Sequence, residues 1–97
     1  MKFAIRFVPS ADNDLGFYRT REQKIVLDAI VKFLEVDADV AGNRRKALRA
    51  NPLAPWELRV GNLRVFYEIK KGALVRVLAI GHKVHNVLFI KGERVEI

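Results

Sequence analysis

The alternation of hydrophobic and polar residues predicts a strand, a long helix and then several more strands. Residues 2–8 place alternate hydrophobic side chains on one face and stop at Pro9, which predicts a strand of about six residues. The polar residues at 10–14 favour capping and a short helical turn. The chain therefore begins with an extended segment that leads into helical structure.

A hydrophobic stripe at helical spacing lies between residues 21 and 38. Val26 and Ile30 belong to one side of this segment, and charged residues recur every three or four positions on the other side. Thr20 and Gln23 have the spacing of a capping box, so we expect the helix to begin beside them. An amphipathic helix of this kind covers one face of a sheet.

The segment 44–49 is strongly basic, and we expect a helical turn there that presents Arg45 and Lys46 to a polyanion. Pro52 and Pro55 follow closely, so a helix cannot continue through them.

The second half of the chain reads as antiparallel strands. The segments with a period of two or a continuous hydrophobic run are residues 56–60, 63–69, 73–80, 86–90 and 94–97. The third is hydrophobic enough for a central strand, and Gly81 is expected to end it. The order predicts an α+β fold, in which an N-terminal strand and one long helix pack on a twisted, mainly antiparallel sheet of four to five strands. We expect residues 1–97 to form a single domain.

The charged residues of the chain indicate what kind of molecule it binds. The 97 residues carry 18 Lys and Arg against 11 Asp and Glu, a net charge of +7. Residues 1–43 carry 6 basic and 7 acidic residues, whereas residues 44–94 carry 12 and 3, so a polyanion should bind the second half. The chain has no cysteine, no signal-like start and no hydrophobic run that could cross a membrane. These features predict a soluble, cytoplasmic protein without membrane contact.

Few residues could carry chemistry. His82 and His85 are the two histidines, with Lys83 between them, and a third ligand for a metal is missing. Ser10 is the single serine and is poorly placed for a triad. Cleavage of RNA through its own 2′-hydroxyl fits better, because it needs a base, an acid and cations. We expect neither a metal nor another cofactor.

Arg59 and Arg64 flank the tight turn Gly61-Asn62 and come close together if the two strands are in register. They could then bind phosphate. The alternative is ordinary pairing on a strand surface with Glu57 and Glu68.

The segment 56–83 resembles the RelE/ParE superfamily of toxins from bacterial and archaeal toxin–antitoxin modules. The residues that carry the resemblance are the hairpin WELRVGNLRVFYEI, the hydrophobic strand VRVLAI and the following Gly-His-Lys. The preceding strand and helix agree with the order of elements in that superfamily.

The resemblance implies a toxin that cuts messenger RNA on the ribosome and thereby inhibits translation. It also implies a cognate antitoxin that holds the toxin inactive, and higher-order complexes of the two proteins. In ribonuclease members, the arginine at the position of Arg64 stabilises the scissile phosphate, and the basic residue at Lys83 compensates charge. Arg59 occupies a position that contacts RNA. The sites expected to bind RNA are Arg45, Lys46, Arg59 and Phe89.

The chain departs from the best-studied ribonuclease branch at three positions. Pro55 and Glu57 stand where that branch has lysines, and Phe89 stands where it has a late tyrosine. A phenylalanine can stack on a base but cannot exchange a proton. We therefore expect His82 or His85 to supply acid and base, with Glu57 as a further candidate, in one pocket shared with Arg64.

Two alternatives to RNA cleavage remain open on the sequence. One is a ParE-like protein that binds DNA gyrase and hydrolyses nothing. The other is a catalytically degenerate toxin that retains only antitoxin binding.

Overall fold

The computed structural model describes residues 2–97, which form two helices and seven strands. In chain order these are β1 (Ala4–Phe7), α1 (Pro9–Gly16), α2 (Thr20–Leu34), β2 (Arg45–Ala47), β3 (Trp56–Val60), β4 (Leu63–Lys70), β5 (Leu74–Val84), β6 (Val87–Ile90) and β7 (Glu93–Val95). The α+β class predicted from the sequence is confirmed.

All seven strands belong to one sheet. Its order is β2-β3-β4-β5-β6-β7 with antiparallel neighbours, while β1 pairs in parallel with β5. The expected four or five strands were too few, and two helices rather than one cover the sheet. The basic segment expected to be a helical turn is instead the short strand β2, paired with β3. Three-residue strands are too short to show a period of two.

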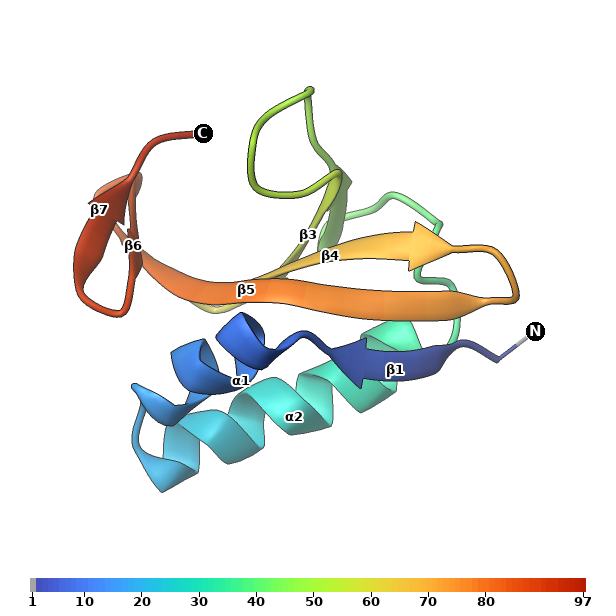
Figure 1. Ribbon diagram of the computed structural model, residues 1–97, viewed down its shortest axis with the longest axis horizontal. Coiled ribbons are helices and arrows are strands. Elements are labelled where there is room, and N and C mark those ends of the chain that lie inside the picture. The colour runs from blue at the N-terminus through green and yellow to red at the C-terminus, as the bar shows by residue number, and fades with distance from the viewer. Residues whose placement is uncertain (1) are drawn as a thin grey trace.

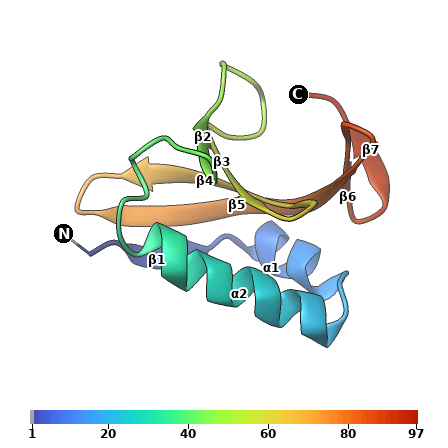
Figure 2. The ribbon, with the colours of Figure 1, turned by 180° about the vertical axis from the view of Figure 1, so that it is seen from behind.

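The helices lie on one side of the sheet (Figures 1 and 2). We call the sheet face that packs on α1 and α2 the helix face, and the opposite face the open face. The β6–β7 hairpin and the loop between β2 and β3 both rise on the open side (Figure 1), and they belong to opposite edges of the strand order.

The alternation along β4 assigns its side chains to the two faces. Leu63, Val65 and Tyr67 join the larger hydrophobic core with Val26 and other residues of α2. Phe66 belongs to a smaller cluster on the open face, together with Ala54, Ala79 and Leu88. The expected division of this strand into two faces is confirmed, and the sheet has hydrophobic contacts on both sides.

The central strand β5 is longer than expected. It continues through Gly81 to Val84, so His82 lies within the strand rather than after it. A Cβ atom on Gly81 would lie 2.5 Å from the carbonyl oxygen of Phe89. Glycine is therefore needed here for the close approach of β6, and it does not end the strand.

The edge of β5 changes partner near Ile80, and Asp14 of α1 fills the gap. β1 pairs with residues 74–77 and β6 with residues 82–84. Between them, the Ile80 amide donates to Oδ2 of Asp14 at 3.1 Å, and Nζ of Lys91 lies 3.8 Å from Oδ1. The buried carboxylate thus satisfies a backbone group that neither strand reaches.

Helix α2 begins one residue earlier than expected and ends earlier than residue 38. The Arg19 amide donates to Oε1 of Glu22 at 3.4 Å, and Gln23 Nε2 donates to the Tyr18 carbonyl at 2.8 Å. The reciprocal cap expected for Thr20 and Gln23 is therefore not the one that forms. Neither helix in residues 2–97 is long and hydrophobic enough to span a membrane.

Candidate nucleic-acid site on the open face

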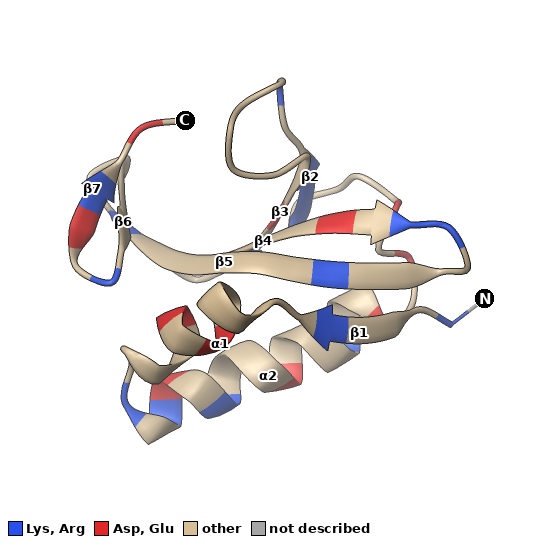
Figure 3. Ribbon diagram, viewed as in Figure 1, with Lys and Arg blue, Asp and Glu red and all other residues tan. Residues whose placement is uncertain are grey.

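The ionisable side chains of the β3–β4 hairpin gather on the open face. Arg59 pairs directly with Arg64 across the hairpin, as expected, and Lys46 of β2 pairs with Glu57. Arg64 in turn pairs with Gly81 of β5, which places Lys83, two residues further on, on the same face. Lys46, Arg59, Arg64 and Lys83 therefore share the open face with Glu57, and Figure 3 marks the basic positions along these strands in blue.

Glu57 lies at the centre of this group. Its side chain is 2% exposed, and its Oε2 accepts a hydrogen bond from Arg59 Nε at 2.8 Å. Its Oε1 lies 3.9 Å from Arg64 Nε, too far for a hydrogen bond but close enough for charge attraction. Glu68 pairs with Arg76 and Lys70 instead. Of the two acidic partners considered from the sequence, Glu57 is the one that faces Arg59 and Arg64.

The guanidinium of Arg64 is mostly buried and incompletely paired. Its Nη1 donates to the carbonyl oxygens of Gly61 and Leu63 at 2.8 and 2.9 Å. Its Nε is buried and has no hydrogen-bond partner. Burial lowers the pKa of Arg64 from its ordinary value; Glu57 opposes this effect and Arg59 adds to it. A buried donor without a partner would gain from an incoming oxygen atom.

His82 lies on the helix face, away from Arg64. It pairs across the sheet with Leu63, a residue of the larger core. Its Nδ1 is 2.8 Å from the Tyr18 hydroxyl, and its ring stacks on Phe89 with the centroids 5.6 Å apart. Burial, followed by the charges of Glu22 and Asp14, raises the pKa of Tyr18 to about 12. The hydroxyl therefore keeps its proton at neutral pH and forms a hydrogen bond with Nδ1 of His82.

The expectation of one pocket shared by Arg64 and His82 is wrong. Successive side chains of a strand point to opposite faces, so His82 cannot share the face of Gly81 and Arg64 once β5 continues past Gly81. The catalytic roles that the sequence suggests for Arg64 and His82 stay predictions.

His85 and Lys83 are placed differently from His82. His85 and Asn86 have φ angles of 50° and 67°, which form the tight turn between β5 and β6. His85 is exposed there. The Lys83 amide donates to the Asn62 carbonyl at 2.8 Å, which fixes this end of β5 beside the β3–β4 turn.

Of the remaining expected RNA contacts, Lys46 lies on the open face and two do not. Arg45 donates from Nε to the Val40 carbonyl at 2.9 Å and from Nη1 to the Phe33 carbonyl at 3.1 Å, so it ties the end of α2 to β2. Phe89 already stacks on His82. These contacts give Arg45 and Phe89 structural roles.

The sequence matches the model of a known family, described as the ParE toxin of the type II toxin–antitoxin system parDE, over residues 5–86. The chain belongs to this toxin family. No curated protein matches the sequence.

Solved structures of toxin–antitoxin complexes share the fold of this toxin. The toxin–antitoxin complex RelBE2 from Mycobacterium tuberculosis has a TM-score of 0.72 and 23% identity, with 86% of this chain and 93% of that chain covered. The archaeal RelE–RelB complex from Pyrococcus horikoshii has a TM-score of 0.68 and 15% identity, covering 88% and 99%. The heterotetrameric YoeB–YefM complex from Staphylococcus aureus has a TM-score of 0.61 and 16% identity, also covering 88% and 99%.

The toxin also contains contacts that the sequence did not reveal. Tyr18 and Asp14 both join the helical segment to β5, across 64 and 66 residues of sequence. Asp14 looked like one of several turn-forming residues, and Tyr18 had no periodic pattern around it. In the sequence, Glu57 is one charged residue on a strand with alternating polarity, and its position between Arg59 and Arg64 could not be predicted from that pattern.

Proposed function

We propose that the protein is the toxin of a type II module and that it inhibits translation by cutting messenger RNA on the ribosome, in the cytoplasm. The observation that carries this proposal is the buried carboxylate of Glu57 held between Arg59 and Arg64, on a face that also carries Lys46 and Lys83. Cations that bind phosphate next to a carboxylate that can accept a proton are the groups that RNA cleavage requires.

The cleavage step assigns a role to each group. Glu57 takes the proton of the ribose 2′-hydroxyl, and the 2′-oxygen attacks the adjacent phosphorus. The bond from phosphorus to the 5′-oxygen breaks, and that oxygen takes a proton from water. His85 is not assigned this step, because it lies six residues along the chain from Ala79 of β5, the residue in line with Glu57, which is about 20 Å at the usual rise of a strand. The products are a 2′,3′-cyclic phosphate and a 5′-hydroxyl end. Arg64 and Lys83 stabilise the negative charge that develops on the phosphate oxygens.

Arg59 controls access to Glu57 in this proposal. The Arg59 side chain is 44% exposed, so an RNA phosphate can reach its guanidinium, whereas Glu57 is 2% exposed and its buried charge then depends on Arg64. An RNA phosphate can replace the carboxylate as its partner. The exchange frees Glu57 for the 2′-hydroxyl and gives the phosphate a second guanidinium.

The expected protein partner is a cognate antitoxin. The solved structures that share the fold are complexes of a toxin with its antitoxin. A chain with a net charge of +7 favours an antitoxin whose binding segment is acidic. Toxin and antitoxin are expected to form higher-order complexes.

A second candidate function is inhibition of DNA gyrase without hydrolysis. The location of His82 on the helix face favours it, because one expected proton donor is absent from the open face. The match to the ParE family is also consistent with it. A toxin that has lost all chemistry and only binds its antitoxin is the remaining alternative.

A ribosome-programmed cleavage assay tests the proposal. The wild type should cut messenger RNA, and Arg64→Ala and Glu57→Gln should each cut about 100-fold more slowly. Arg76→Ala is the matched control, because Arg76 donates to Glu68 at 2.9 Å at the other end of the sheet. It should cut within about threefold of the wild type, as surface pairs contribute little.

The same preparation should be tested for inhibition of gyrase supercoiling. Inhibited supercoiling with intact messenger RNA would reject the proposal in favour of the second candidate. No effect in either assay, together with normal growth on expression, would indicate a degenerate toxin.

A further inference from the structure

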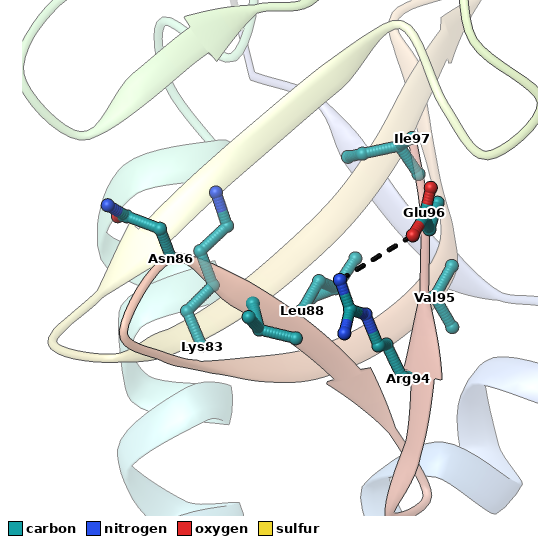
Figure 4. Close-up of a pocket in the computed structure, with 8 residues that line it drawn as sticks. Lys83, Asn86, Leu88, Arg94, Val95, Glu96 and Ile97 are labelled. Atoms are coloured by element: carbon teal, nitrogen blue, oxygen red, sulfur yellow. Dashed lines mark ion pairs between the residues drawn. The ribbon is translucent and has the colours of Figure 1, made fainter.

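A separate cavity lies where the C-terminal hairpin stands beside the end of β5. Its volume is about 350 Å³. The residues that line it include Lys83, Leu88, Arg94, Val95, Glu96 and Ile97. Figure 4 shows Lys83 and Arg94 on either side of the same space, with the Ile97 side chain pointing toward it. The cavity thus joins the end of one strand to the last residues of the chain.

The cations of the cavity are only weakly neutralised. Arg94 Nη2 lies 3.6 Å from Oε1 of Glu96, and the two side chains are 65% and 84% exposed. An ion pair between two exposed side chains contributes little to stability, so another anion can replace Glu96. The carboxylate of Glu96 therefore occupies the position that a phosphate would take.

The cavity also has a hydrophobic part. Leu88 is buried and belongs to the smaller cluster, and Val95 packs against the same cluster. Ile97 is 49% exposed, although it is a large hydrophobic residue. Hydrophobic side chains beside a guanidinium suit a nucleobase, which has an uncharged ring next to its phosphate and can stack on arginine. A free phosphate ion would use only the cations.

Lys83 connects this cavity with the open face. It lines the cavity, and its register places it on the same side of β5 as the residue that pairs with Arg64. Arg94 pairs with Phe89, whose side chain lies on the helix face, but β7 is the edge strand and the Arg94 side chain lines the same cavity as Lys83. An RNA strand bound at Arg64 can therefore continue past Lys83 toward Arg94. The cations along this route form a series, which matches a repeating backbone better than a single carboxylate does.

We propose that this cavity is a second nucleotide subsite, which binds the phosphate and base of a nucleotide flanking the one bound at Arg64. This proposal rests on the proposed RNA-directed function, and it adds the path that the RNA follows over the surface of the protein. Arg94 and Lys83 bind the phosphate, Leu88 and Ile97 contact the base, and Glu96 is displaced. An acidic segment of a protein partner is the competing occupant.

Binding of an RNA that cannot be cut tests the subsite separately from cleavage. A fluorescein-labelled single-stranded oligonucleotide, 2′-O-methylated throughout, is titrated with the full-length protein at several salt concentrations, and anisotropy is recorded. Arg94→Ala should weaken binding about fivefold at 0.1 M salt and reduce the slope of log K against log salt by about 0.7, the effect of one lost phosphate contact. Glu96→Gln should tighten binding about twofold, because it removes the competing carboxylate.

Lys24→Ala is the control, because it removes the same charge from an exposed ion pair with Asp28 on α2. The inference is overturned if Arg94→Ala and Lys24→Ala bind the oligonucleotide alike. It is also overturned if Arg94→Ala weakens binding of an acidic decapeptide but not of the oligonucleotide.

The two proposals can fail independently. A wild type that binds the oligonucleotide in the predicted manner but cuts no messenger RNA on the ribosome supports the subsite and rejects cleavage. A wild type that cuts, while Arg94→Ala binds and cuts like Lys24→Ala, rejects the subsite alone.

Discussion

Arg64 and His82 lie on opposite faces of the sheet, although the cross-strand partner of Arg64 is Gly81, the residue immediately before His82. One step along a strand is enough to separate two side chains by the thickness of the sheet. On the open face, Arg64 consequently lies close to the carboxylate of Glu57, whereas His82 packs between β5 and the helical segment.

The contact between Tyr18 and His82 should contribute to stability. Tyr18→Phe removes the hydroxyl that forms a hydrogen bond with His82 Nδ1 at 2.8 Å and leaves the ring in place. We expect the free energy of unfolding to fall by about 1 kcal/mol, the usual net value of one hydrogen bond. Urea unfolding monitored by circular dichroism measures it. A variant as stable as the wild type would show that the contact carries no net energy.

Stability should decline in alkaline solution. Burial raises the pKa of Tyr18 to about 12 from an ordinary value of 10.0, and burial also raises that of Tyr67, whose hydroxyl donates to the Ala38 carbonyl. A group whose pKa is higher in the folded state contributes stability that is complete below the unfolded pKa and is lost as the pH rises through the folded one. The loss for Tyr18 therefore falls between pH 10 and about 12. Urea midpoints measured from pH 9 upward should fall less steeply for Tyr18→Phe than for the wild type, and equal slopes would contradict the assignment.

Gly81→Ala should destabilise the C-terminal hairpin. The new Cβ would lie 2.5 Å from the Phe89 carbonyl oxygen and 3.0 Å from a side-chain carbon of Ile90. We expect a loss of about 1–3 kcal/mol from overpacking, measured by thermal or urea unfolding. Gly16→Ala is the matched control, because nothing lies within 4 Å of its Cβ. Equal stabilities of the two variants would mean that β6 moves aside without cost.

Arg45→Ala should affect stability more than RNA binding. The substitution removes donors to the carbonyl oxygens of Val40 and Phe33, so about 1–2 kcal/mol of stability should be lost. Arg49→Ala removes the same charge from an exposed arginine. It serves as the control for both the free energy of unfolding and the RNA affinity. An RNA affinity for Arg45→Ala well below that of Arg49→Ala, with stability unchanged, would instead support the direct contact that the sequence suggested.

The sequence predicts the fold where a period of two or of 3.6 extends over enough residues. The two faces of β4 and the register of Arg59 with Arg64 follow from it, because a two-residue turn fixes the pairing of the hairpin. β2 could not be predicted, since three residues show no period and their basic character suggested a surface turn.

The candidate site was predicted in part, for reasons that lie in single residues. Arg59, Arg64, Lys46 and Lys83 share the open face because alternation determines their side. The face on which His82 lies could not be predicted, because a glycine can either end a strand or allow another backbone to approach it closely. Only the position of β6 decides between these two roles of Gly81. The contacts of Asp14 and Tyr18 depend on how α1 docks, which no local pattern specifies.

The most direct test of the central claim compares Arg64→Ala with His82→Asn in single-turnover cleavage of messenger RNA bound to ribosomes. His82→Asn retains a polar atom near the position of Nδ1, and folding of both variants is checked by circular dichroism. If the chemistry belongs to the open face, Arg64→Ala cuts about 100-fold more slowly than the wild type, and His82→Asn stays within about fivefold. A folded His82→Asn variant that cuts as slowly as Arg64→Ala, or an Arg64→Ala variant that cuts at the wild-type rate, would contradict the account.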